Sequence, residues 1–389
     1  MRRLAEAMRD PASTAGLDAA GWSGLITAAR AEQMIGSLAH RLEGQAMPPA
    51  AARILEDARA SAAQWRQAAL WEAEMARRAL APLGIPVVLM KGTAYVAAGL
   101  DAGIGRSIGD LDIMVARDAL DAAEQALLAA GWEWVKPDPY DDAYYRDHMH
   151  ELPPLIHRER DRMIDVHHTI LPLTARQTPD AGAMLSAAIP LPSNSVRPEP
   201  FDDACGVAQD KLRPVGRSRG TLVPAPRVST ALDTNGMRGA GPGPGTSEGL
   251  LIFSPEDMFL HGVAHLFADG DLAGGLRNLW DQDRLLRQFA PVAGFWARLG
   301  DRARHHQLAP HLALALRLAR AVYGTPVDPA LAGRWRWSDA LYLRRLTVRD
   351  GWGRQRRPVT RLAFYVRSHW LRMPPAMLAR HLWTKWRKG

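Results

Sequence analysis

An alternating run of acidic and apolar residues at 110–115 constrains the fold of this 389-residue chain more than any other feature. The run is Asp-Leu-Asp-Ile-Met-Val, and successive residues of a β-strand point to opposite faces. Asp110 and Asp112 would share one face, about 6.5–7 Å apart along the backbone. Leu111 and Ile113 would point the other way, into a core. The run therefore predicts a sheet with carboxylates on one side and hydrophobic packing on the other.

A third acid, Asp165, lies in a similar run, where it alternates with Ile164 and Val166. Neighbouring carboxylates repel one another unless a cation lies between them, and oxygen ligands suit Mg²⁺ or Mn²⁺. Three carboxylates that hold two such ions are suited to in-line phosphoryl transfer. An isolated Asp-x-Asp also occurs in surface turns and in metal-dependent glycosyltransferases, so these alternatives stay open.

A second candidate site element is Lys91-Gly92-Thr93, between an apolar run at 85–90 and an expected helix at 94–100. Glycine allows a phosphate to approach the backbone closely, and lysine, threonine and amides supply donors. Arg106 precedes Asp110 by four residues and would add a phosphate contact. The alternatives are a simple strand-to-helix turn and an Arg106 that is a surface charge or pairs with Asp110.

Changes in composition and hydrophobic periodicity along the chain predict an α+β fold with five segments. They are a helical region at 1–84, a mixed α/β core at 85–192, a Pro/Gly-rich flexible insertion at 193–248, a helical domain at 249–350 and a basic tail at 351–389. The core should contain strands at 85–90, 107–115, 132–135, 152–157 and 162–168, with a helix at 118–130. Ser254 followed by Pro255 predicts the start of the later helices.

Cysteine and histidine usage limits the other chemistries. The single cysteine, Cys205, excludes an internal disulfide framework and a cysteine-based zinc site. His167 and His168 could join His148 or His150 at a zinc ion, but the spacing is not compact, so we expect one of the two to pack or bond locally and the other to be solvated. The start of the chain does not resemble a secretory signal, and no apolar run is long enough to span a membrane. We therefore expect a cytoplasmic protein.

Positive charge is concentrated near the end of the chain. Residues 341–389 contain 13 Lys and Arg and one acid, Asp350, so this segment carries a charge of +12. Because the whole chain has a net charge of +8, the remaining residues sum to −4. Residues 361–388 interleave arginine with tryptophan and leucine, a composition typical of interfacial amphipathic helices, expected as a pair split near residue 374. We expect an anionic membrane surface as the partner; nucleic acid is the less favoured partner, and a helical cap on the body is the remaining alternative.

Three motifs occur in a characteristic order. They are Leu89-Met90-Lys91-Gly92, Arg106-Ser107-Ile108-Gly109-Asp110-Leu111-Asp112-Ile113 and Ile164-Asp165-Val166-His167. Together with Phe253–His265 and with Asp281, they resemble the uncharacterised nucleotidyltransferase family of the DNA polymerase β-like superfamily, over about residues 80–170 and 250–290. The superfamily's usual Gly-Ser or Gly-Gly is replaced here by Lys91-Gly92-Thr93.

The resemblance implies a nucleotidyltransferase fold, a small mixed sheet flanked by helices. It implies that Asp110, Asp112 and Asp165 are catalytic metal ligands for Mg²⁺ or Mn²⁺, and that an NTP is bound near Lys91, Gly92, Thr93 and Arg106. The first hypothesis is therefore a metal-dependent enzyme that moves a nucleoside monophosphate from an NTP to an unknown acceptor. The alternative is a non-catalytic nucleotide-binding or scaffold protein, which the basic tail would hold at the inner membrane face.

Overall fold

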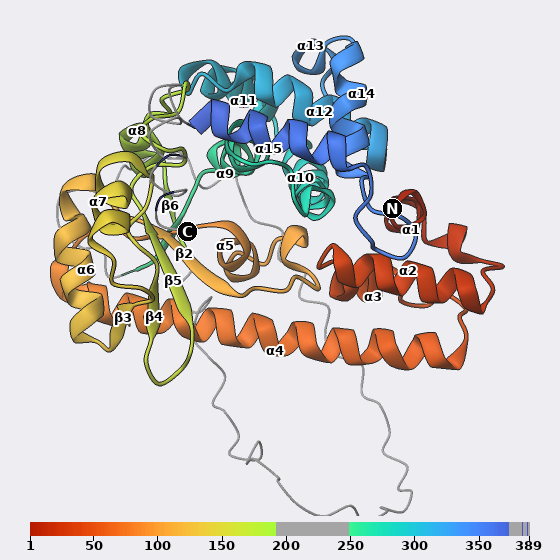
Figure 1. Ribbon diagram of the computed structural model, residues 1–389, viewed down its shortest axis with the longest axis horizontal. Helices are drawn as coiled ribbons and strands as arrows, with labels where there is room; N and C mark the ends of the chain where they lie inside the picture. Colours follow the sequence, from red (N-terminus) through yellow and green to blue (C-terminus); the bar gives the residue numbers. More distant parts are fainter. Residues whose placement is uncertain (192–248, 373–382, 384–386, 388–389) are drawn as a thin grey trace, which may run out of the picture.

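The computed structural model describes residues 1–191 and 249–372, together with Trp383 and Arg387. Within them the protein is an α+β structure with helices on both sides of a mixed sheet, as predicted (Figure 1). The expected insertion at 193–248 and most of the second helix of the tail lie outside the described residues. No helix in the described ranges has both the length and the apolar character needed to cross a bilayer.

The N-terminal region is helical. Its elements are α1 (Arg2–Arg9), α2 (Ala19–Ala31), α3 (Ile35–Arg41) and α4 (Pro49–Leu80), with short 3₁₀ turns at Pro11–Thr14 and Ala81–Leu83. Proline suits the first turn of α4 because its missing N–H would have no helical acceptor there. Helix α4 runs the length of the molecule beneath α5 and contacts α5, α6 and β2 (Figure 1). It thus forms one wall of the fold.

Seven strands form one mixed sheet in the order β3-β4-β5-β2-β1-β7-β6. Their bounds are β1 (Val88–Leu89), β2 (Asp110–Met114), β3 (Trp132–Trp134), β4 (Leu155–His157), β5 (Met163–His167), β6 (Ile189–Pro190) and β7 (Leu251–Ile252). All five predicted strands are present, each shorter than its apolar run. Strands β6 and β7 were not predicted, and β7 pairs in parallel with β1 although it lies where the helical domain was expected to begin.

Four helices accompany the sheet. They are α5 (Lys91–Ala97), α6 (Leu120–Ala129), α7 (Pro139–His148) and α8 (Ala181–Ser186), with 3₁₀ turns at Asp101–Gly103 and Arg117–Ala119. Helix α5 begins three residues earlier than expected, so Lys91-Gly92-Thr93 is its first turn and not a loop before it. Helix α7 was not predicted. It begins at the cap Asp138, whose carboxylate accepts hydrogen bonds from the amides of Tyr140 and Asp141.

The C-terminal part is a helical layer above the sheet (Figure 1). It contains α9 (Pro255–Val263), the π-helical turn η5 (Ala264–Asp269), α10 (Gly275–Phe289), α11 (Phe295–His305), α12 (Ala309–Tyr323), α13 (Pro329–Ala332), α14 (Trp337–Leu346) and α15 (Pro358–Arg372). As predicted, Ser254 caps α9, accepting a hydrogen bond from the amide of Asp257. Helix α15 is the part of the predicted tail pair that the structure describes, and it contacts α14 and η5.

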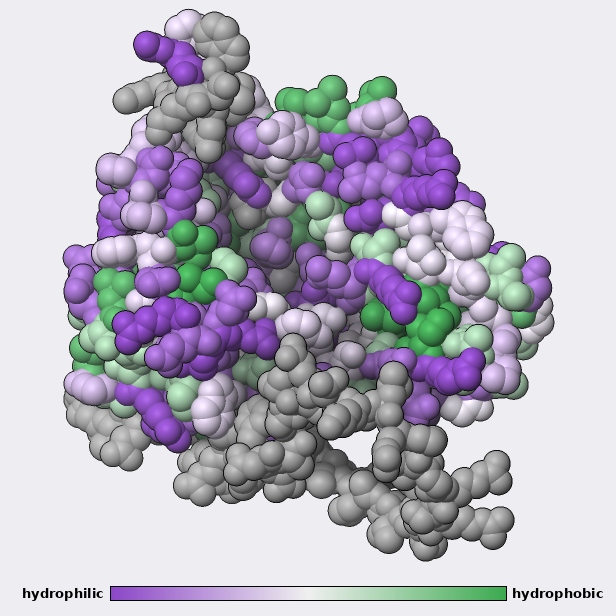
Figure 2. All heavy atoms as spheres, turned by 60° about the horizontal axis from the view of Figure 1, so that its bottom comes forward, coloured by the Kyte–Doolittle hydropathy of each residue, from purple (hydrophilic) through white to green (hydrophobic). Residues whose placement is uncertain are grey.

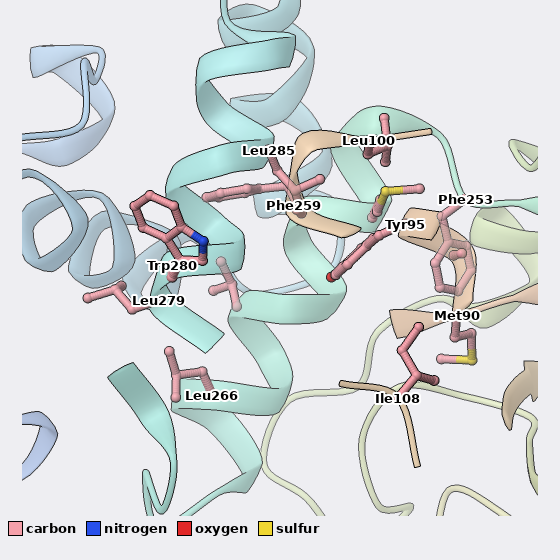
Figure 3. Close-up of a cluster of buried hydrophobic side chains, with 14 of the residues drawn as sticks. Met90, Tyr95, Leu100, Ile108, Phe253, Phe259, Leu266, Leu279, Trp280 and Leu285 are labelled. Atoms are coloured by element: carbon pink, nitrogen blue, oxygen red, sulfur yellow. The ribbon is translucent and has the colours of Figure 1, made fainter. Parts of the chain in front are cut away.

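One hydrophobic core joins the sheet to this helical layer. Figure 3 shows Met90, Tyr95 and Leu100, from around α5, packed among Phe253, Phe259 and Leu285 of the helical part. All of these side chains are buried. The surface is different: the face in Figure 2 is mostly hydrophilic, with separate hydrophobic patches. The shared core fixes the helical layer against the face of the sheet that carries the acids.

Candidate active site

The three predicted acids lie together on one face of the sheet. Strands β2 and β5 are parallel neighbours, and their register places Asp112 opposite Asp165. Asp110 is exposed at the start of β2, whereas Asp112 is buried. One oxygen from each of the three carboxylates lies within 4.8 Å of the others. We call Asp110, Asp112 and Asp165 the acid cluster.

Asp112 is the member of the cluster whose negative charge is balanced by neighbouring side chains. Its Oδ1 accepts a hydrogen bond from Lys91 Nζ at 2.6 Å and lies 3.0 Å from His167 Nε2. Burial opposes ionisation of Asp112, but Lys91 and His167 outweigh it and hold the pKa of Asp112 well below its usual range. Lys91 also has a positive φ of 47°, a costly conformation for a residue with a Cβ. A strained backbone therefore aims the ammonium into the cluster.

Asp165 has the opposite electrostatic environment. Burial, then the charges of Asp112 and Glu151, raise the pKa of Asp165 to about 7. Its Oδ1 is buried and makes no hydrogen bond within the described part of the chain. An acid that is poorly solvated, repelled by its neighbours and unpartnered is in an environment that a cation would stabilise. The donor set is all oxygen, which suits Mg²⁺ or Mn²⁺.

The Lys91-Gly92-Thr93 turn is arranged differently from a simple phosphate cradle. The Lys91 ammonium is held by Asp112, and Thr93 is buried with no partner for its hydroxyl among the described residues. Gly92 has a clear steric reason: a Cβ there would lie 2.5 Å from Arg106 Nε. Glycine lets Arg106 pass directly over the first turn of α5.

Arg106 is anchored by the helical layer and not by Asp110. Its guanidinium donates to the buried carboxylate of Asp281 on α10 and lies over the ring of Tyr95, 5.3 Å from its centroid. Nearby, Arg277 donates to the carbonyl of Ser107 at 3.1 Å. Burial, then repulsion by Arg106, lowers the pKa of Arg277 to about 10. Two guanidiniums facing one carboxylate leave this wall of the site positively charged.

Some of these groups border a cavity of about 610 Å³, within the usual range for small-molecule sites, whereas Asp165 and Thr93 are not among its lining residues. Its lining includes Lys91, Gly92, Arg106, Asp110 and Asp112, together with residues that we did not predict: Gln33, Trp65, His265, Arg277 and Asn278. The latter come from the N-terminal and C-terminal helical parts of the chain, with Gln33 in the turn between α2 and α3. They have no local sequence signal, apart from His265, which ends the Phe253–His265 stretch of the family resemblance.

A second group of metal-binding residue types lies directly behind Asp112. His150, Glu151 and His167 each offer an atom within 4.8 Å of the others. Glu151 Oε2 is 3.4 Å from His167 Nδ1 and 3.6 Å from His150 Nε2. We call these three residues the histidine cluster. The His168 side chain, by contrast, lies 3.2 Å from the local carbonyl of Met149 and does not join this cluster. Both His167 and His168 are buried, so the expectation that one of them is solvated is wrong.

A comparison with protein families identifies the family to which the chain belongs. The profile of the uncharacterised nucleotidyltransferase family matches residues 18–198 and 223–324. The chain belongs to this family. The match begins well before residue 80, and so includes most of the N-terminal helices as well as the sheet. It omits 199–222, in the middle of the expected insertion. No curated protein and no solved structure matches the chain.

The family assignment supports a transferase that acts on nucleotides, and the resemblance stated from the three motifs is confirmed. The family description specifies neither an acceptor nor an ion. Those features have to be argued from the site of this chain.

Proposed function

We propose that this nucleotidyltransferase is metal-dependent and moves a nucleoside monophosphate from an NTP to an acceptor hydroxyl or phosphate. The observation that carries the proposal is the surplus negative charge of the acid cluster. Its three carboxylates lie close together, the Lys91 ammonium is hydrogen-bonded to Asp112, and Asp165 has a buried oxygen with no hydrogen bond among the described residues. Such an arrangement is unfavourable on its own and favourable around a divalent cation.

Asp110, Asp112 and Asp165 would hold Mg²⁺ or Mn²⁺. When bound, the ions would supply charge neutralisation for the triphosphate and a lower pKa for the attacking group. The positively charged wall formed by Arg106 and Arg277 would orient the phosphates, which can approach closely over Gly92. In this proposal Lys91 keeps Asp112 ionised and Thr93 supports the turn from behind.

Nucleotide binding and turnover by the full-length protein test this proposal. Thermal unfolding is measured with each NTP, with and without Mg²⁺, and NTP hydrolysis to NMP and pyrophosphate is followed, with water replacing the acceptor. We expect a stabilisation of about 2.7 kcal/mol at 100 times the dissociation constant, only with ion and nucleotide together. Asp110→Asn should abolish it, whereas Asp118→Asn, an exposed acid four residues after Met114, should not. Equal shifts in both variants would contradict the proposal.

A second candidate function, attachment to an anionic membrane surface, is favoured by the exposed face of α15. Five large apolar side chains on this helix are exposed among its arginines: Val359, Leu362, Tyr365, Val366 and Trp370. Only Phe364 and Ser368 of α15 are buried. An apolar stripe flanked by basic residues suits the interface of an anionic bilayer.

Vesicle sedimentation tests the membrane proposal. Full-length protein should sediment with phosphatidylglycerol vesicles and not with phosphatidylcholine vesicles. The Leu362→Ser/Val366→Ser variant should lose this binding, whereas Ile104→Ser, an exposed apolar residue far from α15 in sequence, should retain it. Wild-type protein that remains in solution with both vesicles would overturn the idea. A scaffold without catalysis would retain vesicle binding and show no nucleotide turnover.

A further inference from the structure

The proposed nucleotidyl transfer assigns no role to His150 and Glu151 of the histidine cluster. The ring of His167 lies between Glu151 and the acid cluster: its Nε2 faces Asp112 and its Nδ1 faces Glu151. The His150 ring is 5.3 Å from that of His167, centroid to centroid, and tilted by 33°. Three potential ligands thus meet at one point on the side of His167 away from Asp112.

A buried ring nitrogen of this cluster lacks a hydrogen bond among the described residues. Nδ1 of His167 faces Glu151 Oε2 at 3.4 Å, a distance longer than a good N–H···O bond, and makes no hydrogen bond within the ranges that the structure describes. The nitrogen of His150 nearest the same oxygen is Nε2, at 3.6 Å. Buried polar atoms are rarely left in this state without a ligand or a water.

The separations fit a metal ion better. Ligand atoms about 2.0–2.2 Å from a tetrahedral zinc ion are themselves about 3.3–3.6 Å apart, as the Glu151 contacts are. Two imidazoles and one carboxylate are a donor set for a borderline divalent metal such as Zn²⁺, whereas the all-oxygen acid cluster suits Mg²⁺. The side chains of His150 and Glu151 remain 12% and 17% exposed, which leaves a path for an ion.

The surroundings also match what metal-bound histidines require. A ligating histidine usually donates its other ring nitrogen to a carboxylate, which fixes the ring orientation. If Nδ1 of His167 bound a metal, Nε2 would carry the proton and donate it to Asp112 Oδ1, 3.0 Å away. Asp112 is in turn held by Lys91. His167 would then connect two cation sites of different chemistry through one carboxylate.

We propose that His150, Glu151 and His167 bind a divalent transition metal of the Zn²⁺ class, at a site separate from the acid cluster. The site uses one ring nitrogen of His150, Nδ1 of His167 and the carboxylate of Glu151, and Asp112 orients His167 from outside it. This site does not depend on whether the chain transfers nucleotides.

Zinc binding by the full-length protein without a histidine tag tests the proposal. The protein is stripped with a chelator and titrated with Zn²⁺ against a chromophoric competitor, in excess Mg²⁺ so that the acid cluster is occupied. We expect one tight Zn²⁺ per chain. His150→Gln should weaken it by more than the about 10–100-fold typical of changes to outer-shell partners, and Asp112→Asn should fall within that range.

The matched controls are His305→Gln and Asp110→Asn. His305 also lies close to a carboxylate, 3.1 Å from Asp180, but on an exposed surface, and Asp110 belongs only to the acid cluster. Both should retain wild-type zinc affinity. A wild-type protein with no more zinc than His150→Gln would overturn the proposal, as would zinc that Mg²⁺ displaces or that Asp110→Asn loses.

Cobalt substitution provides a readout that needs no variant. Co²⁺ in the stripped wild-type protein should show the visible absorption of an ion with imidazole ligands and low coordination number, unchanged by excess Mg²⁺. A spectrum identical to hydrated Co²⁺ would contradict the site, even if His150→Gln failed to fold.

Discussion

Buried carboxylates occur in both the helical layer and the acid cluster, and the two regions neutralise them in different ways. In the helical layer, Asp339 accepts two hydrogen bonds from Arg317, at 2.6 and 3.1 Å. Asp257 has Arg302 and, 3.4 Å away, His306. Burial opposes ionisation of both acids, yet these partners lower the pKa of each. Each of these two carboxylates of the helical layer therefore has a guanidinium of its own.

The acid cluster lacks this one-to-one pairing. Lys91 and His167 serve Asp112, whereas the pKa of Asp165 is raised to about 7 because burial and neighbouring carboxylates disfavour its charge. Burial alone therefore does not single out a candidate functional carboxylate. A shortage of cationic partners does, because only a ligand from outside the chain can supply the missing charge.

The largest expected effect on stability comes from breaking a buried ion pair in the helical layer. Arg317→Leu leaves the Asp339 carboxylate buried without its guanidinium and should lower the free energy of unfolding by about 3–5 kcal/mol. Urea denaturation followed by circular dichroism measures this loss. NTP hydrolysis by the fraction that remains folded should stay at the wild-type level, because Arg317 does not line the cavity. A loss below 1 kcal/mol would remove the distinction between the two regions.

The second effect is on turnover. Asp110→Asn removes an exposed ligand candidate, and an interaction worth several kcal/mol at a metal centre corresponds to a fall of about 10³-fold in NTP hydrolysis, at about 1.4 kcal/mol per tenfold. The free energy of unfolding in chelator should change by no more than about 0.5 kcal/mol, as for an ordinary surface substitution. Unchanged hydrolysis would show that the cluster is not the reaction centre.

The third effect is a gain in stability. Asp165→Asn removes a disfavoured charge and should stabilise the metal-free protein by about 1–3 kcal/mol at pH 8, since each unit of raised pKa is worth about 1.4 kcal/mol. The folded carboxyl, with a pKa of about 7, retains its proton above the ordinary value of 3.8. Wild-type stability from this group is thus complete below pH 4 and lost as the pH rises through 7.

Urea titrations in chelator at several pH values check this prediction. The difference in free energy between Asp165→Asn and wild type should grow between pH 4 and 7 and then level off. In saturating Mg²⁺ the order should reverse, because the wild-type carboxylate then has a cation. A variant less stable than wild type in chelator at pH 8 would refute the surplus-charge interpretation.

The smallest effect concerns an exposed ion pair. Arg304 and Asp301 pair on the surface, with side chains 66% and 70% exposed. Arg304→Leu should change the free energy of unfolding by about 0–1 kcal/mol, because solvent screens the pair. This variant is the matched control for Arg317→Leu, and a loss as large as that of Arg317→Leu would show that arginine content, and not buried pairing, sets stability in the helical layer.

Several elements followed directly from local patterns. The alternation around Asp110 and Asp165 predicted β2 and β5, and the serine-proline pair predicted the start of α9. Helix α7 was missed because it has no buried residues and therefore no apolar stripe. Its only signal is a cap at Asp138, followed by proline.

In the candidate active site, too, some features were predictable from local sequence and others were not. The shared face of Asp110 and Asp112 was predictable because side-chain direction alternates with a period of two along any strand. The partner of Arg106 was not, since Asp281 is 175 residues away. A zinc ion at His167 and His150 was one interpretation of the sequence, but their spacing is not compact. Glu151 was missed as their neighbour because it faces His167 only through an antiparallel bridge.

The sequence by itself predicted the candidate site residues and determined that two of the acids share a face. Only the tertiary structure decided the charge balance of the acids. The parallel register brings Asp165 beside Asp112, and the first turn of α5 points Lys91 toward Asp112. Arg106 pairs with Asp281 of α10. Strand alternation is a property of the local backbone. Neutralisation depends on which elements pack together, because Coulomb interactions act across space and not along the chain.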